Sequence, residues 1–273
     1  DPAPAFWLLA LAYAPLASSA QTLDPIRVRI WCEGESSPSA YPGGVDAALA
    51  DGLARHPEMR ITRARLDDPE AGVGDKALDE TDVLLWWGRA RHDELPDDRA
   101  EAVASRVRNG RLGLVALYTS CGSKPFRLLM SGTPCEPASW REDGRPEFVA
   151  VKAPDHPIAA GVSPFTIPKT DMFSEPFAVP EPETVVFVSS WERGETVRSG
   201  LTWTVGKGRV AYLRTGSESY PVLFHPSVRR SIANAVSWDA ERRGDGPGSC
   251  VGPGSHGRAG DAPELLTVPG AIL

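Results

Sequence analysis

An uninterrupted apolar run in the first half of the chain limits the folds open to it. Segment 82–87, DVLLWW, is apolar from Val83 to Trp87, with no polar residue in alternation. A strand with one face in water alternates apolar and polar residues, so a continuous run is typical of a central parallel strand buried on both faces. Segment 112–118, LGLVALY, has the same character. We therefore expect a parallel sheet that is covered by helices on both faces.

The segments around these two runs alternate between strand and helix patterns. Residues 26–32 and 60–66 alternate and carry β-branched side chains, as strands do. Apolar spacing and helix-end residues predict helices at about 43–56 and 96–110, and a short helix at 123–132. This order of elements predicts an α/β fold with a doubly wound, mainly parallel sheet.

The second half of the chain has a different rhythm. It is rich in strand patterns, and a Lys-Gly pair between two of them predicts a hairpin turn near residues 206–208. Residues 226–243 form an amphipathic helix pattern, with Val228, Ile232 and Val236 on one face. We expect antiparallel strands added to the parallel sheet, followed by a final helix.

The two ends of the chain differ from its middle. Residues 6–20 are apolar and then small, which resembles a signal peptide, although no basic residues precede them. Residues 244–273 begin with a Gly-, Pro- and Ser-rich stretch that cannot form a core. We expect one α/β domain at 24–243, a signal-like or disordered extension at 1–23 and a disordered tail. The expected compartment is the cytoplasm, with export as the alternative if the extension is a signal remnant.

Charge and cysteine content narrow the classes of partner and compartment. The formal net charge is −7 and the basic residues are scattered, which argues against nucleic acid as a partner. The four cysteines, Cys32, Cys121, Cys135 and Cys250, show no CxxC spacing. Free thiols in a reducing compartment are the first expectation, and a Cys121–Cys135 disulfide is the alternative.

The most polar cluster of the chain directly follows its most apolar strand. Residues 88–94 read GRARHDE, and two further loops, 33–41 and 119–124, also follow predicted strands. In doubly wound sheets, ligands bind in the crevice at the carboxyl ends of the strands. The sequence therefore places a candidate site where these three loops meet.

Many stretches resemble the ThuA-like family, named for trehalose utilization. The most specific are WWG followed by HDE within 86–94, and IANAVSW at 232–238; IRVRIWCE, YPGGVDAALADGL, SWRE, DHPIAAGV and GKGRVAYLRTGSESYP also match in family order. The resemblance runs from about Ile26 to Trp238. It implies a flavodoxin-like α/β sandwich similar to class I glutamine amidotransferases. It also implies a role in bacterial disaccharide catabolism, alongside sugar oxidoreductases that make 3-keto sugars.

The chain departs from the family at its histidines. Relatives commonly read WWGHxAH where this chain reads WWGRARH, so Arg89 takes one histidine position and His92 is kept. They read LHSGHxSK where this chain reads LYTSCGSK, so Tyr118 and Cys121 replace two histidines. Near the end of the domain PGHETYP becomes TGSESYP, in which Ser217 replaces a third histidine.

These replacements bear on whether the site holds a metal. A metal site needs three or four imidazoles, thiolates or carboxylates in fixed geometry. Of the family's Arg-His-Glu after the first strand, Glu33 alone is kept. The resemblance suggests a divalent ion in relatives, but Arg89 would repel a cation here. We therefore expect no cofactor and no tightly bound metal.

The first functional hypothesis is acid–base chemistry on a keto-disaccharide or a related carbohydrate. Arg89 would stabilise developing oxyanion charge, and His92 and Glu218 would move protons. One of Trp86 and Trp87 would pack in the core, and the other would line the crevice against a sugar ring. The residues expected to bind substrate are Glu33, Tyr41, Trp87, Asp93, Cys121, Lys124, Ser217, Tyr220 and His225.

Two further hypotheses stay open, and several residues have a purely structural alternative. The chain could be a non-catalytic carbohydrate-binding or regulatory relative, because several histidines are lost at once. It could also be a hydrolase with Cys121 as nucleophile, since that cysteine lies in a strand-to-helix turn. His225 is equally explained as a flanking residue of the last helix, and His92 as a solvated loop residue. A homo-oligomer is left open.

Overall fold

The computed structural model describes residues 24–34 and 38–241. The signal-like extension, the tail and Cys250 lie outside the described residues. The first half contains β1 (Ile26–Cys32), α1 (Val45–Leu53), β2 (Met59–Arg65), α2 (Asp75–Asp79), β3 (Val83–Trp87), α3 (Asp97–Arg108), β4 (Gly113–Leu117) and α4 (Lys124–Leu129). The second half contains β5 (Pro137–Val151), β6 (Phe165–Phe177), β7 (Thr184–Ser190), β8 (Thr196–Val205), β9 (Gly208–Leu213) and α5 (Pro226–Ala240).

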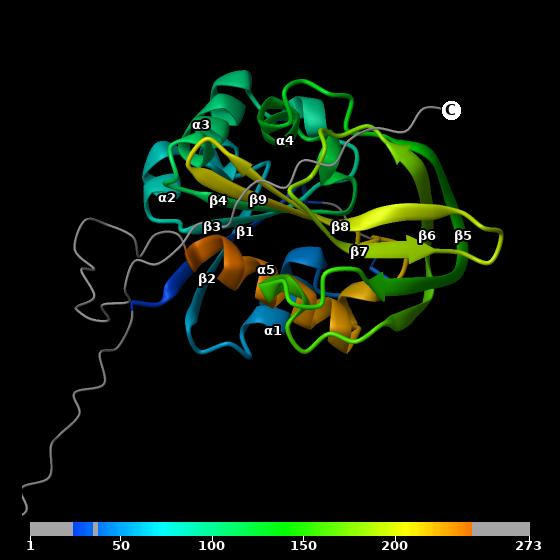
Figure 1. Cartoon of the computed structure of the whole chain (residues 1–273). Helices are drawn as coiled ribbons and strands as arrows, with labels where there is room; N and C mark the ends of the chain where they lie inside the picture. The colour runs from blue at the N-terminus through cyan, green and yellow to red at the C-terminus, as the bar shows by residue number, and fades with distance from the viewer. Residues whose placement is uncertain (1–23, 35–37, 242–273) are drawn as a thin grey trace, which may run out of the picture.

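Within the described residues the strands form one nine-stranded sheet, in the order β2-β1-β3-β4-β9-β8-β7-β5-β6. The neighbours from β2 to β9 run parallel, and those from β9 to β6 run antiparallel. Helices α2, α3 and α4 cover one face and α1 and α5 the other (Figure 1). The predicted doubly wound sheet with added antiparallel strands is confirmed.

The two apolar runs occupy the centre of this sheet. Every residue of β3 and of β4 is buried, as expected for strands with helices on both faces. On one face Trp86 stacks on Trp31 of β1, with ring centroids 3.7 Å apart. The predicted face of α5 is also correct, since Val228, Ile232 and Val236 are buried.

The turn between β8 and β9 lies where it was predicted. Gly206 has a φ of 63°, which favours glycine. A Cβ at this position would lie 2.5 Å from the carbonyl oxygen of Arg108, so the turn also needs a residue without a side chain. The hairpin thereby packs closely against the end of α3.

The sequence did not predict the length of β5, whose first half is polar and contains Gly144. This strand and β6 pair with several register shifts and form an arm at one end of the sheet (Figure 1). The start of the arm is brought over the carboxyl ends of β3 and β4, which matters for the site. Within the described part of the chain, no helix is both long and apolar enough to cross a bilayer.

Candidate functional site

A hollow of about 480 Å³ lies at the carboxyl ends of β3 and β4. One wall is made by Arg89 and His92 after β3 and by Tyr118 and Cys121 after β4. The second half of the chain supplies further lining residues, namely Glu136 just before β5, Trp140 of β5 and Phe173 of β6. The crevice predicted from the first-half loops therefore exists, but the second half of the chain supplies part of its lining.

His92 is held between two glycines in this hollow. A Cβ on Gly88 would lie 3.1 Å from Cε1 of the imidazole, and a Cβ on Gly122 would lie 3.0 Å from its Cδ2. Burial lowers the pKa of His92, because the charged form loses water, and the nearby Glu33 opposes this effect. The imidazole is therefore neutral at neutral pH and is able to accept a proton.

Glu33 builds the loop that carries His92. Its buried carboxylate accepts hydrogen bonds from the backbone N–H of Ala90 at 2.7 Å and of Arg91 at 3.0 Å. Arg91 in turn donates to the Glu33 carbonyl oxygen at 2.9 Å. Glu33 was predicted to bind substrate, but both of its carboxylate oxygens are occupied by the protein and it does not line the hollow. This part of the prediction is corrected.

Arg89 and Glu218 form an ion pair through Arg89 Nε and Glu218 Oε1. The Glu218 side chain is buried, whereas that of Arg89 is 46% exposed and lines the hollow. The arginine therefore brings positive charge to the site and shares it with a carboxylate below. Of the three residues predicted to be catalytic, Arg89 and His92 line the hollow and Glu218 lies behind Arg89.

Three of the predicted binding residues are core residues. Trp87 is fully buried and donates its indole N–H to the Gly216 carbonyl at 2.7 Å. Tyr41 is buried, and its hydroxyl is within 2.9 Å of the Ser217 carbonyl and 2.7 Å of the Tyr220 carbonyl. Ser217 is itself buried. Because β3 is covered on both faces, neither Trp86 nor Trp87 lines the crevice, which corrects that expectation.

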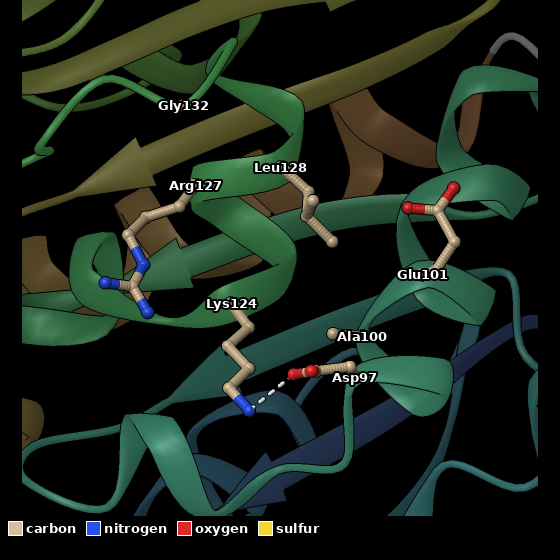
Figure 2. A pocket seen from close by; sticks show the side chains of 7 residues that line it. All are labelled: Asp97, Ala100, Glu101, Lys124, Arg127, Leu128 and Gly132. Carbon is tan, nitrogen blue, oxygen red and sulfur yellow. Dashed lines mark hydrogen bonds and ion pairs between the residues drawn. The ribbon is translucent and has the colours of Figure 1, made fainter.

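A second hollow, of about 650 Å³, lies apart from the first (Figure 2). One of the predicted binding residues, Lys124, lines it. It lies between α3 and α4, where Lys124 pairs with Asp97 at 2.6 Å. Arg127 of the same helix pairs with the exposed Asp93 at 2.9 Å. Lys124 therefore lines this second hollow, and Asp93, next to His92 in the chain, is exposed and paired with α4; neither residue lines the hollow around His92, contrary to the prediction.

The last two predicted binding residues lie near other elements. His225 begins α5, where its Nδ1 accepts the backbone N–H of Ser227 at 3.2 Å, and its ring stacks on Phe165. This is the structural alternative for that histidine. Tyr220 is partly buried and close to Gly144 of β5, since a Cβ on that glycine would lie 2.9 Å from the phenol oxygen. Neither residue lines the hollow.

Cys121 lines the hollow but is a poor candidate for a nucleophile. The residue is 3% exposed, and burial raises the pKa of its thiol to about 12. A nucleophilic cysteine needs a lowered pKa, because the thiolate is the reactive form. Cys32, Cys121 and Cys135 are all free thiols, so the Cys121–Cys135 disulfide is not formed, while the reducing compartment stays a prediction.

We expect Cys121 in the native protein to react with iodoacetamide at least about tenfold more slowly than free cysteine at the same pH, because its pKa is raised and it is buried. The rate is measured by mass spectrometry of the alkylated peptide. Cys135→Ala is the control, because it removes the second thiol of the hollow, so that alkylation there is due to Cys121. A native rate equal to that of free cysteine would restore the hydrolase hypothesis.

The residues around the hollow do not fit a bound metal. In residues 24–34 and 38–241, no three His, Cys, Asp or Glu side chains gather in a way that could hold an ion. His92 is the imidazole that lines the hollow, and each carboxylate oxygen of Glu33, beside its loop, already accepts one backbone N–H. We therefore derive no step through a metal.

Sequence reasoning missed three residues that matter to the hollow. Trp140 is 46% exposed and lines it from the β5–β6 arm. Asp171 of β6 is buried and accepts the Tyr118 hydroxyl at 2.7 Å. Arg214, which follows β9, is buried and donates to the Asp171 carbonyl oxygen at 2.8 Å. The strand that holds Asp171 reads FTIPKTDMFSEPF and carries several other polar residues, so the sequence held no signal that singles out Asp171.

The comparisons with known proteins agree with this fold. A family model described as trehalose utilisation, ThuA, matches residues 27–239. A ThuA-like protein from Bacteroides uniformis superimposes with a TM-score of 0.56 at 14% identity, over 82% of this chain and 95% of that chain. A Thermoplasma acidophilum protein, described provisionally as part of a GMP synthase, gives a TM-score of 0.50 at 15% identity, over 81% of this chain and 96% of that chain. No curated protein matched the chain.

Proposed function

The chain belongs to the ThuA family of trehalose utilisation, and from that premise we propose that the hollow around His92 binds a neutral disaccharide or its keto form and acts on it by acid–base chemistry. The observation that carries this proposal is that a neutral imidazole and an exposed tryptophan line one hollow. A volume of about 480 Å³ is within the range of pockets that take small ligands.

Trp140 supplies the apolar surface that a sugar ring needs. Its side chain is 46% exposed although it is large and aromatic, and it lines the same hollow as His92. The C–H edges of a sugar stack well on an aromatic face and lose little hydration there. Trp140 therefore takes the role that the sequence had assigned to Trp87.

His92 supplies the proton acceptor. Its neutral form predominates at neutral pH because burial lowers its pKa, and a base of this kind removes a proton from a hydroxyl group or from a carbon next to a carbonyl. Arg89 brings positive charge to the same wall, where it would favour negative charge that develops on a substrate oxygen.

The same arrangement favours a second candidate, a carbohydrate-binding protein without catalysis. The observation behind it is the Arg89–Glu218 ion pair, which binds two of the three predicted catalytic residues to each other. In this case the hollow would hold the sugar through Trp140 and polar contacts, and His92 would accept a hydrogen bond without moving a proton.

One experiment distinguishes the two candidates. The protein is incubated with trehalose and with 3-keto-trehalose, and ligand-observed NMR follows binding while product formation is followed in the same sample. Turnover of either sugar supports the enzyme, and binding without turnover supports the binding protein. If neither sugar binds nor reacts, both proposals fail for these ligands.

We expect Trp140→Ala to weaken binding of the sugar by between about twofold and about tenfold, because an aromatic contact contributes about 0.5–1.5 kcal/mol. The dissociation constant is measured by NMR titration. Phe148→Ala is the matched control, since Phe148 is equally exposed on the same strand but does not line the hollow. Equal losses in the two variants would remove Trp140 from the site.

A further inference from the structure

Tyr118, Asp171 and Glu218 form a buried acidic cluster behind the wall of the hollow. The Tyr118 hydroxyl lies 2.7 Å from Asp171 Oδ2, and the Glu218 carboxylate faces the same phenol. Asp171 is 1% and Glu218 6% exposed. Two carboxyl groups thus meet at one hydroxyl group that has a single proton to donate.

The carboxylate oxygens of this cluster outnumber the hydrogen-bond donors that reach them in good geometry. In the described part of the chain, Asp171 Oδ1 and Glu218 Oε2 are buried and meet no donor in good hydrogen-bond geometry, although the Ser217 hydroxyl is near enough to Asp171 to lower its pKa. Glu218 has the Arg89 guanidinium as its counter-charge, whereas Arg214 reaches the backbone oxygen of Asp171 and not its carboxylate. An unpaired buried anion next to another carboxylate is costly, and binding one proton removes that cost.

We propose that Asp171 carries this proton, and that Tyr118 relays it between Asp171 and a ligand oxygen in the hollow. With Asp171 protonated, its O–H donates to the phenol oxygen, and the Tyr118 O–H is free to donate to Glu218 or to the ligand. Tyr118 lines the hollow with 1% of its surface exposed, so it contacts the ligand through that small exposed part, and Asp171 acts through it. The role in catalysis rests on the proposed function, but the location of the proton does not.

The backbone at Tyr118 supports a functional reason for this arrangement. Tyr118 has a φ of 59°, which is strained for a bulky aromatic residue. The Tyr212 hydroxyl holds it there by donating to the Tyr118 carbonyl at 2.9 Å. This conformation directs the chain so that Tyr118 both lines the hollow and reaches Asp171.

The charges around Asp171 are consistent with a bound proton. Burial raises the pKa of the Asp171 carboxyl above its ordinary value; hydrogen bonds from Tyr118 and Ser217 and the charge of Arg214 oppose this effect, and the negative charge of Glu218 adds to it. Burial and the adjacent carboxyl groups raise the pKa of Tyr118 as well. The titratable and charged groups that face the cluster are Tyr41, Arg89, Tyr118, Arg214, Glu218 and Tyr220.

The proton count of the relay balances, because the ligand gains one proton from Tyr118 and loses one proton to His92. The Tyr118 O–H bond breaks as its proton passes to the ligand oxygen, and the Asp171 proton passes to the phenol oxygen. Asp171 is left as a carboxylate, while His92 has taken a proton from the ligand and become an imidazolium. Return of that proton through solvent restores both groups, so no other reactant is needed.

The location of the proton is tested by an experiment that does not depend on enzymatic activity. Protein labelled with ¹³C at the aspartate carboxyl carbons is titrated by NMR. We expect one resonance to titrate above the ordinary value of about 3.9, to be absent in Asp171→Asn, and to move to lower pH in Glu218→Gln, which removes the neighbouring charge. If the Asp171 resonance titrates at its ordinary value, the proposal is overturned. The wild-type and Glu218→Gln titrations decide this even if Asp171→Asn does not fold.

The relay is tested by kinetics. We expect Tyr118→Phe and Asp171→Asn each to lower kcat by about 100-fold, with KM changed less than about threefold, and the double variant to lose no more than the single ones because they act as a unit. Ser231→Ala is the control, because it removes a buried hydroxyl that donates to the Ser227 carbonyl within α5 and does not line the hollow. Additive losses would overturn the relay. A wild type without turnover would defeat the proposed function and the relay together, while the titration still decides where the proton lies.

Discussion

Replacing Arg214 by methionine is expected to lower the free energy of unfolding by about 3–5 kcal/mol, the cost of leaving one member of a buried ion pair alone. Arg214 is 1% and Glu147 2% exposed, and Arg214 Nη2 pairs with Glu147 Oε2. Without the guanidinium, Glu147 keeps the Ser189 hydroxyl as a donor but loses its counter-charge in a place that water does not reach. This is the largest stability effect that we expect from a single substitution in the chain.

Arg214 also has contacts that methionine cannot replace. Its guanidinium lies 5.3 Å from the ring centroid of Phe173 and 5.2 Å from that of Trp191. It donates to the carbonyl oxygen of Asp171 at 2.8 Å and to Thr170 Oγ1 at 3.3 Å. These contacts fix β6 behind the hollow, so the loss is expected to affect the position of Asp171 as well as the stability of the protein.

The measurement is urea unfolding of the two proteins, with the free energy obtained by linear extrapolation. The double variant Glu147→Gln/Arg214→Met is the control, because it removes both charges. We expect it to be more stable than Arg214→Met alone, since no unpaired charge is then left in the core. A loss of unfolding free energy below about 1 kcal/mol in the single variant would show that the buried charge of Glu147 does not need Arg214 as its counter-charge.

The sheet could be predicted from the sequence because burial on both faces leaves a simple pattern. The continuous apolar runs of β3 and β4 are fully buried, and the punctuation of α3 and of the β8–β9 turn matches the structure. These features depend on residues close in the sequence. The β5–β6 arm could not be predicted in this way, because the first half of β5 is polar and has no apolar alternation. Its structure depends on contacts between residues distant in the sequence.

The candidate site could be predicted only in part, for the same reason. The sequence identified which loops lie at the carboxyl edge, and so it found Arg89 and His92. It could not tell that Lys124, three residues after Cys121, turns towards Asp97 of α3. Nor could it tell that each carboxylate oxygen of Glu33 accepts a backbone N–H of the next loop. Direction of a side chain depends on packing, which a single sequence does not show.

Residues that come to the hollow from distant parts of the sequence were a second obstacle to prediction. Trp140 and Asp171 come from strands that are distant in sequence from His92, and the β5–β6 pairing brings them to it. A tryptophan was expected in the crevice on chemical grounds, and one is there, but it is Trp140 and not one of the two in β3. The presence of an aromatic side chain was therefore easier to foresee than the residue that supplies it.

The largest effect on activity is expected from His92→Asn, which should lower kcat by between about 10² and 10⁴, the contribution of a positioned general base. Asparagine keeps a polar side chain between Gly88 and Gly122 but cannot take up a proton. Burial lowers the pKa of His92 below its ordinary value, so the active, neutral form is present above that pKa and is lost as the pH falls through it. The wild type should therefore show an acidic limb in kcat/KM that the variant lacks.

The control for this variant is His56→Asn, a histidine on the surface that pairs with Glu58 at 3.2 Å, far from the hollow. It should leave both kcat and the acidic limb unchanged. Trehalose and 3-keto-trehalose serve as substrates, and binding is measured separately by NMR. If His92→Asn binds the sugar as tightly as the wild type and turns it over at the same rate, the base lies elsewhere. In that case His92 serves only to fill the space between its two glycines.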